Sequence, residues 1–340
     1  MSITANIDRI TRVPDAYRMP VVPAPKSVKI ELSPRCNLRC AFCSLRTRET
    51  QPGVEDDMDF SLFRRITTEM REAGVEEIGA FYLGESFSNP ELLVKAVRWC
   101  KHDLQFPYVF LTTNGTLASP DVVEEVMRAG LDSLKWSVNA ADEAQYAAIM
   151  GVKGSLFWRS LANLRDAWRI RQAGELPTRL YASSIRYNDE QDRCMDIMLK
   201  HFVLPYVDEH YWLPAYSMAL RAEEMRERHG WNVTVGNMGR YDPALGTGNR
   251  AGQDVCWAAF TEGHVRADGH LSACCFGSTD RFDVGDLTRE SFLDAWNGAA
   301  MQHIRGLHLR VSEEGPEVLR GSMCEVCLPE KADAVQGQEG

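Results

Sequence analysis

Between residues 27 and 214, short apolar runs alternate with stretches of helical periodicity, and this alternation constrains the fold more than any other feature. Several runs are almost continuously apolar, which is typical of parallel strands covered on both faces. Six βα units are too few for a closed eight-stranded barrel. The pattern therefore predicts an α/β fold, an open or partial (β/α)6 TIM-like barrel with its site at the carboxyl ends of the strands. Strands are expected at Ser27–Leu32, Glu77–Leu83, Tyr108–Thr113, Ser133–Asn139, Arg179–Arg186 and His210–Pro214.

The stretches between these runs carry helix start and stop signals. Asp59 precedes an apolar face that ends at Gly74. The pairs Asn89–Pro90 and Ser119–Pro120 each place a capping residue before a proline at the first helical position. These signals predict helices on the faces of the parallel sheet.

Beyond residue 214 the pattern changes. We expect a charged helix over 218–230, a loop rich in Gly and Asn over 236–252, a hairpin over 263–275 that turns at Asp268–Gly269, and a last helix over 291–309. The chain is therefore divided into an N-terminal extension, the barrel, a small C-terminal domain and a flexible tail, with bounds 1–26, 27–235, 236–330 and 331–340.

Composition narrows the class of protein. The 340 residues carry a net charge of −10, which argues against a nucleic-acid partner. No apolar run reaches about 18 residues, so no membrane span is expected. The first twenty residues lack the apolar core of a secretory signal, and we expect a cytoplasmic location. Thiols stay reduced there, so the ten cysteines call for a metal or catalytic explanation.

Three cysteines follow the first expected strand directly, as Cys36, Cys40 and Cys43. Three thiolates on one loop can hold three irons of a [4Fe–4S] cubane and leave the fourth iron open to an outside ligand. Zinc usually takes four ligands, and no partner pair lies nearby. The spacing favours an iron–sulfur site over a zinc site.

Four further cysteines form a second set near the C-terminus. Cys256 precedes the hairpin, Cys274 stands at its end, and Cys324 and Cys327 form a Cys-x2-Cys pair. Four thiolates can saturate either a second cubane or one structural zinc ion. Spacing alone leaves these two interpretations balanced.

The Cx3Cx2C triad after the first strand of a partial barrel, with an aromatic residue before the last cysteine, resembles the radical S-adenosylmethionine (SAM) superfamily. The resemblance implies that SAM chelates the open iron and is cleaved to a 5′-deoxyadenosyl radical that abstracts a substrate hydrogen. It also implies an external electron donor such as flavodoxin or ferredoxin.

The same resemblance implies a set of SAM contacts. Gly84-Glu85 matches the end of the family's Gly-Gly-Glu stretch, with Leu83 in place of the first glycine, and Glu85 would meet the SAM amino group. Phe42 would lie near the adenine. The other implied contacts are Asn114 in Thr-Asn-Gly, Ser137 and Asn139 in a Ser-x-Asp-like pattern, and Ser184 and Arg186 on the fifth strand.

The second set resembles the twitch domain, a shortened SPASM domain that holds one auxiliary [4Fe–4S] cluster on Cys256, Cys274, Cys324 and Cys327. Because the resemblance implies four protein thiolates, this cluster would have no open iron and would suit electron transfer. Only 35 residues precede Cys36, fewer than the peptide-binding module of many relatives needs, which favours a small substrate.

The spacing of the second set resembles that of aminocyclitol dehydrogenases of aminoglycoside antibiotic pathways. The resemblance implies oxidation of a secondary alcohol of an aminocyclitol or amino-sugar to a ketone, with the auxiliary cluster accepting an electron. Glu209 and Tyr82 are candidate proton acceptors near the expected site. Two other functions stay open, a sugar or peptide epimerase with Cys275 as hydrogen donor, or a decarboxylase. A zinc-bearing, non-catalytic binding protein is the alternative from another class.

Overall fold

The computed structural model describes residues 2–47, 56–187, 189–216, 227–228, 230–234, 255–277 and 280–328. Its centre is one ten-stranded sheet with the order β10-β9-β8-β1-β2-β3-β4-β5-β6-β7. The expected charged helix over 218–230 lies almost wholly outside the described residues, and the expected loop over 236–252, the boundary at 235–236 and the tail lie wholly outside them.

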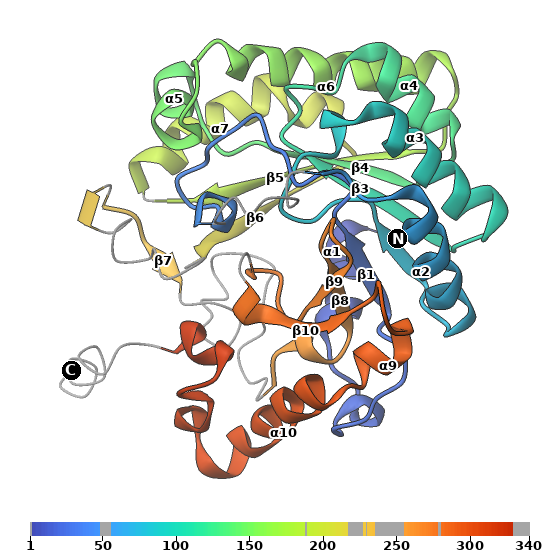
Figure 1. The fold of residues 1–340 in the computed structure, drawn as a ribbon. Coiled ribbons are helices and arrows are strands. Elements are labelled where there is room, and N and C mark those ends of the chain that lie inside the picture. Colours follow the sequence, from blue (N-terminus) through green and yellow to red (C-terminus); the bar gives the residue numbers. More distant parts are fainter. Residues whose placement is uncertain are drawn as a thin grey trace.

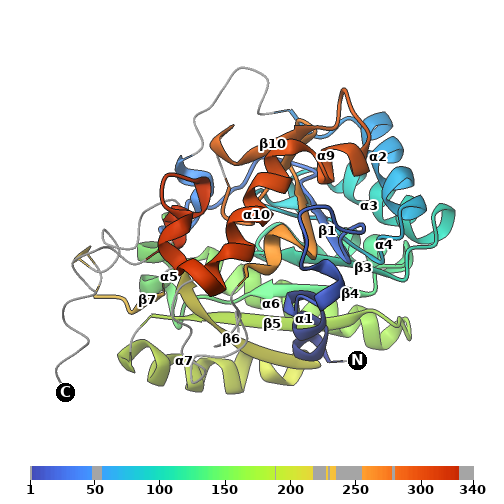
Figure 2. The same cartoon turned by 90° about the horizontal axis from the view of Figure 1, so that it is seen from below.

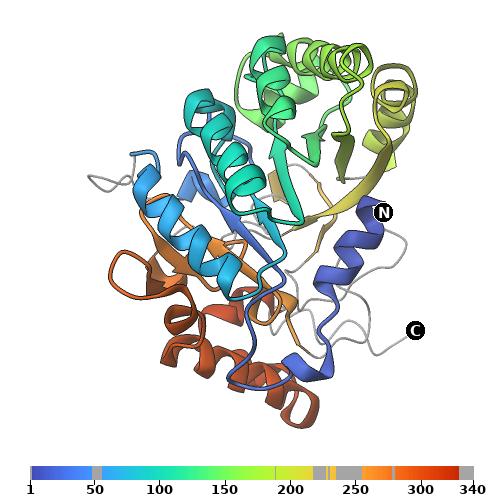
Figure 3. The same cartoon turned by 90° about the vertical axis from the view of Figure 1, so that its right-hand side faces the viewer.

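Six consecutive parallel strands form the barrel wall, which confirms the predicted partial barrel. They curve around the barrel interior (Figure 3). The predicted bounds of the third and fifth strands match those observed. The six strands are β1 (Ser27–Ile30), β2 (Glu77–Gly79), β3 (Tyr108–Thr113), β4 (Ser133–Ser137), β5 (Arg179–Arg186) and β6 (Glu209–Tyr216).

Helices cover the outer face of this wall (Figure 1). Asp59 and Asn89 cap α2 and α3 by accepting backbone N–H bonds, as their positions in the sequence predict. Outward-facing strand residues such as Val28, Leu134 and Trp136 are fully buried beneath the helices. The helices are α2 (Phe60–Glu72), α3 (Pro90–Arg98), α4 (Pro120–Arg128), α5 (Glu143–Met150), α6 (Leu156–Ala173) and α7 (Asp189–Phe202).

The C-terminal region joins the barrel sheet rather than forming a separate sheet. β8 (Glu262–Val265) pairs in parallel with β1, and it forms the predicted hairpin with β9 (His270–Ser272). Gly269 adopts φ +89° in the hairpin turn, a conformation that favours glycine. Two further strands, β7 (Val233–Thr234) and β10 (Asp283–Asp286), were not expected.

The single helix predicted over 291–309 is wrong. The structure has two helices there, α9 (Phe292–Trp296) and α10 (Ala299–Glu314), separated by Asn297 and Gly298. The Asn297 side chain donates to the Val22 carbonyl and accepts from its N–H. The prediction of one helix relied on a continuous apolar periodicity. The contact with Val22 instead favours a break in the helix at Asn297.

The N-terminal extension contains α1 (Ile3–Thr11), which lies across one end of the barrel (Figure 2). Ile3, Ile7 and Ile10 face the barrel interior. The extension therefore closes the end of the barrel opposite to the carboxyl ends of the strands. No helix in the described part of the chain is long and apolar enough to cross a membrane.

Candidate active site

The loop after β1 carries the first three cysteines. Cys36, Cys40 and Cys43 are all partly buried, and none of the ten cysteines, which all lie in the described part of the chain, forms a disulfide. Burial, followed by the nearby Glu85 carboxylate, raises the pKa of Cys36 to about 12. The Asn114 amide reaches the Cys36 sulfur at 3.9 Å. The loop thus gathers three thiols beside the carboxyl ends of β1 to β3.

Backbone hydrogen bonds hold this loop against α5. Arg39 N–H donates to the Met150 carbonyl at 2.9 Å, and Ala41 N–H donates to the Ile149 carbonyl at 2.7 Å. Cys43 N–H donates back to the Cys40 carbonyl at 3.1 Å. The second and third cysteines are therefore positioned by fixed backbone and not only by their side chains.

The Gly84-Glu85 stretch packs directly on the cysteine loop. A Cβ atom on Gly84 would stand 1.8 Å from the Ser33 carbonyl oxygen, so only glycine fits there. Glu85 N–H donates to the Arg35 carbonyl at 2.8 Å. The glycine that the sequence singled out is thus required for close approach of the two loops.

The Glu85 carboxylate is buried and accepts three hydrogen bonds from the protein. The donors are the Thr113 hydroxyl and the Asn114 N–H, both at 2.8 Å, and the Phe87 N–H at 3.3 Å. Burial nevertheless raises the pKa of this carboxyl group. Glu85 therefore ties the loops after β2 and β3 together, and its contact with SAM stays a prediction.

Other residues implied as SAM contacts lie at the same end of the barrel. Ser137 shares the inner face of β4 with Lys135, and the Asn139 side chain accepts the Ile185 N–H at 3.0 Å. The Phe42 ring lies 6.4 Å from that of Tyr187. These positions are compatible with the predicted contacts.

Ser184 and Arg186 face the other way, and their prediction as SAM contacts needs correction. Ser184 is fully buried, with its hydroxyl 3.0 Å from His210 Nε2. Arg186 Nε lies 3.7 Å from the Asp192 carboxylate of α7, and the Arg186 guanidinium carbon lies 4.7 Å from the centre of the Trp212 ring. Both side chains thus lie on the helix-covered face of β5.

The inner face of β5 carries Ser183 instead. Its side chain hydrogen-bonds the Tyr211 hydroxyl, and Tyr211 lines the barrel cavity. A shift of one residue along a strand moves a side chain to the opposite face. The sequence predicted the strand β5 itself, but only the pairing of β5 with β6 decided which serine faces inward.

The second cysteine set is brought together from three segments. Cys256 precedes a 3₁₀ turn at Trp257–Ala259, Cys274 follows β9, and the turn Met323–Cys327 supplies the last two ligands predicted, Cys324 and Cys327. Burial, then the charges of Cys327 and Cys324, raise the pKa of Cys256 well above its usual range. Cys256 thus lies near Cys324 and Cys327, and Cys274 lies near Cys256 and Cys327.

Cysteine thiols are the ligands that iron–sulfur clusters use. Among the described residues, no three side chains of His, Cys, Asp or Glu converge closely enough to hold a single metal ion. The chemistry of both cysteine sets fits the iron–sulfur clusters predicted for them.

Tyr82 connects the loop after β2 with the second cysteine set. Its hydroxyl donates toward the carbonyls of Cys274 at 2.6 Å and Gly277 at 2.8 Å. Burial raises the pKa of Tyr82 well above its usual value. The proposed catalytic role for Tyr82 is therefore replaced by a structural one, because its hydroxyl holds the loop that carries Cys274.

Glu209 also has a structural role. It is the first residue of β6, at the end of the barrel opposite to the cysteine triad. Its carboxylate accepts the N–H groups of Ile3 at 3.0 Å and Thr4 at 3.3 Å. Glu209 therefore caps α1 and does not face the site at which a proton acceptor was expected.

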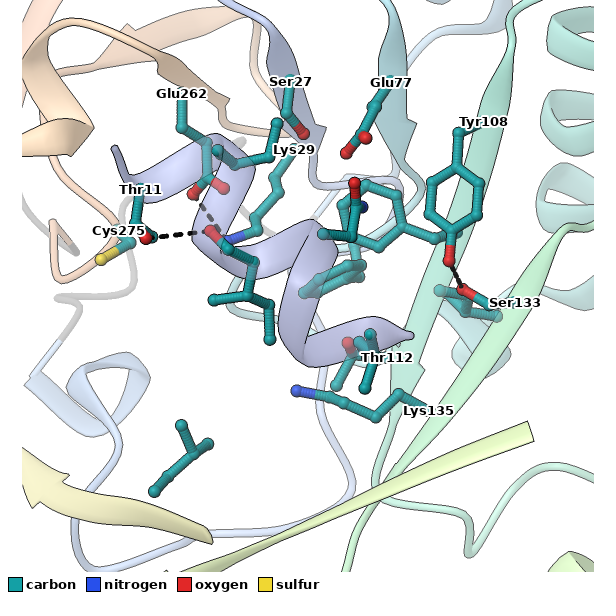
Figure 4. A pocket seen from close by; sticks show the side chains of 18 of the residues that line it. Thr11, Ser27, Lys29, Glu77, Tyr108, Thr112, Ser133, Lys135, Glu262 and Cys275 are labelled. Atoms are coloured by element: carbon teal, nitrogen blue, oxygen red, sulfur yellow. Dashed lines mark hydrogen bonds and ion pairs between the residues drawn. The ribbon is translucent and has the colours of Figure 1, made fainter. Parts of the chain in front are cut away.

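The barrel encloses a cavity of about 250 Å³ that the sequence did not reveal (Figure 4). Lys29 of β1, Lys135 of β4 and Glu262 of β8 line it, and Lys29 Nζ lies 2.6 Å from the Glu262 carboxylate. Cys275 and Phe276 form part of the wall beside the second cysteine set. The cavity therefore adjoins Cys274, and α1 closes its other end.

The charges in this cavity perturb one another. Burial alone would raise the pKa of Glu262, but the Lys29 ammonium and His264 lower it to about 2. Burial, then the Lys29 charge, lower the pKa of Lys135 to about 7. The sequence contained a signal for the two lysines, because a charged residue within an apolar strand is costly to bury and therefore indicates a functional or paired position.

Comparison with known families identifies both halves of the site. Residues 30–170 match the Radical SAM superfamily, and residues 256–328 match SPASM, an iron-sulfur cluster-binding domain. The chain thus contains a radical SAM domain and a SPASM-type domain. These domains imply a [4Fe–4S] cluster with SAM in the first and auxiliary iron–sulfur chemistry in the second, rather than zinc.

Individual relatives are distant. The PqqA peptide cyclase of Streptomyces rochei is 34% identical over 140 residues, which cover 39% of this chain and 35% of that protein. The chain thus spans well under half the length of that curated relative. The structure of Streptococcus suis SuiB bound to S-adenosylmethionine aligns with a TM-score of 0.61 at 15% identity. The alignment covers 84% of this chain and 69% of the SuiB chain. This likeness shows a common fold.

BtrN in complex with AdoMet and 2-DOIA aligns with a TM-score of 0.49 at 12% identity, and the alignment covers 83% of this chain and 86% of that one. A likeness at this level carries no argument about substrate. The aminocyclitol resemblance therefore depends on the spacing of the cysteines alone.

Proposed function

We propose that the protein is a radical SAM dehydrogenase that oxidises a secondary alcohol of a small aminocyclitol or amino-sugar to a ketone. One auxiliary [4Fe–4S] cluster on Cys256, Cys274, Cys324 and Cys327 accepts an electron. The observation that carries the proposal is the cavity in the barrel, which adjoins the second cysteine set.

The size and walls of the cavity favour a small polar substrate. Its volume of about 250 Å³ lies just below the range of typical small-molecule sites. Because α1 covers one end, only a short length of chain would fit inside the cavity. Lysine, carboxylate and tyrosine groups on the walls can hydrogen-bond a polyol.

The position of the cavity suits an oxidation that removes one hydrogen atom and one electron separately. When bound, SAM and its cluster supply the adenosyl radical, and the auxiliary cluster accepts the electron. Cys275 lines the cavity and is the chain neighbour of Cys274, so an electron from the substrate has a short path to the second set. An external donor, flavodoxin or ferredoxin in our prediction, supplies the electron that starts each turnover.

An epimerase is the second candidate, because Cys275 lines the cavity and a thiol there can return a hydrogen atom to a substrate radical. Because the chain is similar to a peptide cyclase, the epimerase could act on a peptide as well as on a sugar. No observation favours the decarboxylase.

An anaerobic assay distinguishes these functions. Reconstituted enzyme is incubated with SAM, reductant and a panel of aminocyclitols and sugar alcohols, and products are read by mass. We expect a loss of about two mass units together with 5′-deoxyadenosine. In deuterated water an epimerase instead gives product of unchanged composition that carries solvent deuterium, and that result would refute the dehydrogenase proposal.

A further inference from the structure

Lys135 is a lysine placed inside the barrel. It lies in the middle of β4, where its neighbours Leu134 and Trp136 are fully buried on the helix-covered face. Strand alternation therefore directs the Lys135 side chain into the cavity, where its ammonium end projects beneath α1 and near Thr112 (Figure 4). A ligand in this cavity can therefore contact the end of Lys135.

The nitrogen of Lys135 lacks a carboxylate partner within the described part of the chain. Its hydrogen-bond partner there is the Tyr211 hydroxyl at 3.2 Å, and it lies 5.6 Å from the centre of the Tyr211 ring. The nearby Glu262 carboxylate is already engaged by Lys29 at 2.6 Å and by His264 at 2.8 Å. A buried cation without a counter-ion is costly, so the uncharged amine is favoured.

The charged groups around Lys135 act in opposite directions, and Lys29 has the larger effect. Lys29 on β1 disfavours a second positive charge, while Glu262 on β8 opposes this effect. On the adjoining strands, Tyr181 lies opposite Lys135 in register, and Tyr211 is uncharged because burial raises its pKa. Glu77 also lines the cavity, and its carboxylate is paired with Arg9.

The balance leaves the pKa of Lys135 at about 7, with burial as the main cause and Lys29 as the second. Near neutral pH a large fraction of the side chain is therefore a free amine with an available lone pair. General bases work best when their pKa lies near the working pH.

We propose that Lys135 is the general base that accepts the hydroxyl proton of the substrate, an inference that rests on the proposed dehydrogenation. The alcohol R₂CH–OH loses the carbinol hydrogen atom to the adenosyl radical, which becomes 5′-deoxyadenosine. Its O–H proton passes to Lys135 Nζ, and one electron passes to the oxidised auxiliary cluster. The C–H and O–H bonds break, a C=O double bond forms, and the Lys135 side chain becomes an ammonium group.

Other groups in the cavity are less suited to this role. Glu262, with a pKa of about 2, is too weak a base, and Lys29 is held as an ammonium by the Glu262 carboxylate. Glu209 caps α1 and Tyr82 donates to backbone carbonyls. Lys135 combines access to the cavity with a lone pair.

Kinetics of two variants test the assignment. Lys135→Arg keeps a positive charge but cannot accept a proton, and Lys135→Gln removes the charge without adding bulk. We expect both to lower ketone formation about 100-fold or more while 5′-deoxyadenosine formation changes little. The wild-type rate of ketone formation should rise with pH through about 7, and both variants should lose this limb. Lys95→Arg, on the exposed face of α3, is the matched control.

A direct measurement does not depend on turnover. In the whole protein with ¹³C-labelled lysine, one side-chain NMR signal should titrate near pH 7, and Lys135→Arg should remove it while Lys95→Arg should not. If the signal that Lys135→Arg removes titrates above about pH 9, the inference is overturned.

The outcomes separate this inference from the proposed function. If the wild-type enzyme forms ketone and either variant keeps its rate and pH limb, Lys135 is not the base although the function stands. If the variants raise KM and leave kcat unchanged, Lys135 only binds the substrate, and the inference is again overturned. If the wild-type enzyme forms no ketone from any alcohol in the panel, the proposed function fails and the inference fails with it.

Discussion

The two cysteine sets differ in how the chain builds them. Cys36, Cys40 and Cys43 occupy one loop and are partly exposed, whereas Cys256, Cys274 and the Cys324–Cys327 pair come from three separate segments. The first set needs only a local turn and supports from neighbouring loops. The second exists only when the C-terminal region has folded onto the barrel.

This difference has a chemical counterpart. Three thiols on an accessible loop leave a cluster position open for an outside ligand, while four thiols in a more enclosed setting saturate a cluster. Tyr82 physically joins the two sites, because it follows β2 beside the first loop and hydrogen-bonds the Cys274 carbonyl. We therefore expect one site to perform chemistry and the other to exchange electrons.

The largest effect is expected from the first set. Replacing Cys36, Cys40 and Cys43 together with alanine removes all protein ligands of the open cluster and should abolish SAM cleavage, measured as 5′-deoxyadenosine under anaerobic reductant. Cys194→Ala, at an exposed position on α7, is the control and should cleave SAM normally. Retained cleavage in the triple variant would refute the assignment of this loop.

Replacing Cys324 and Cys327 with alanine tests the second set. The iron content of the reconstituted protein should fall from about eight to about four per chain, because one of two cubanes is lost. SAM cleavage should persist in part, while ketone formation stops. If ketone still formed at the wild-type rate, the two sites would not differ in the way proposed.

A smaller effect is expected where the first loop packs on its support. Gly84→Ala places a methyl group 1.8 Å from the Ser33 carbonyl, which forces the loop to move. We expect a loss of about 1–3 kcal/mol in the free energy of unfolding and weaker SAM binding by calorimetry. Gly306→Ala in α10 meets no atom within 4 Å and should not destabilise the protein. Unchanged SAM affinity in Gly84→Ala would mean that the loop contact does not shape the site.

The smallest effect concerns the link between the sites. Tyr82→Phe removes the hydroxyl that bonds the Cys274 and Gly277 carbonyls, at a cost of about 0.5–1.5 kcal/mol in the free energy of unfolding. It should also lower the yield of ketone per 5′-deoxyadenosine, because the loop with Cys274 loses its anchor. Tyr17→Phe loses one bond to the Ala24 carbonyl, away from both sites, and should leave that yield unchanged. Equal yields in the two variants would show that Tyr82 does not position Cys274.

Most of the barrel could be predicted from the sequence. The strands Tyr108–Thr113 and Arg179–Arg186 have the predicted bounds, because apolar β-branched and aromatic runs and helix caps are local signals. The inner residue of β5 could not be predicted, since its face depends on pairing with β6. The role of Glu209 was also hidden, because its partners lie about two hundred residues away in α1.

The order of residues by itself determined the parallel units, the triad loop and the hairpin turn at Gly269, since each arises from neighbours along the chain. Tertiary structure alone decided the parallel pairing of β8 with β1, the closure of the barrel by α1, and the cavity that joins Lys29, Lys135 and Glu262. The physical reason is that the environment of a charged side chain depends on which distant surfaces exclude water around it, and no local pattern records those surfaces.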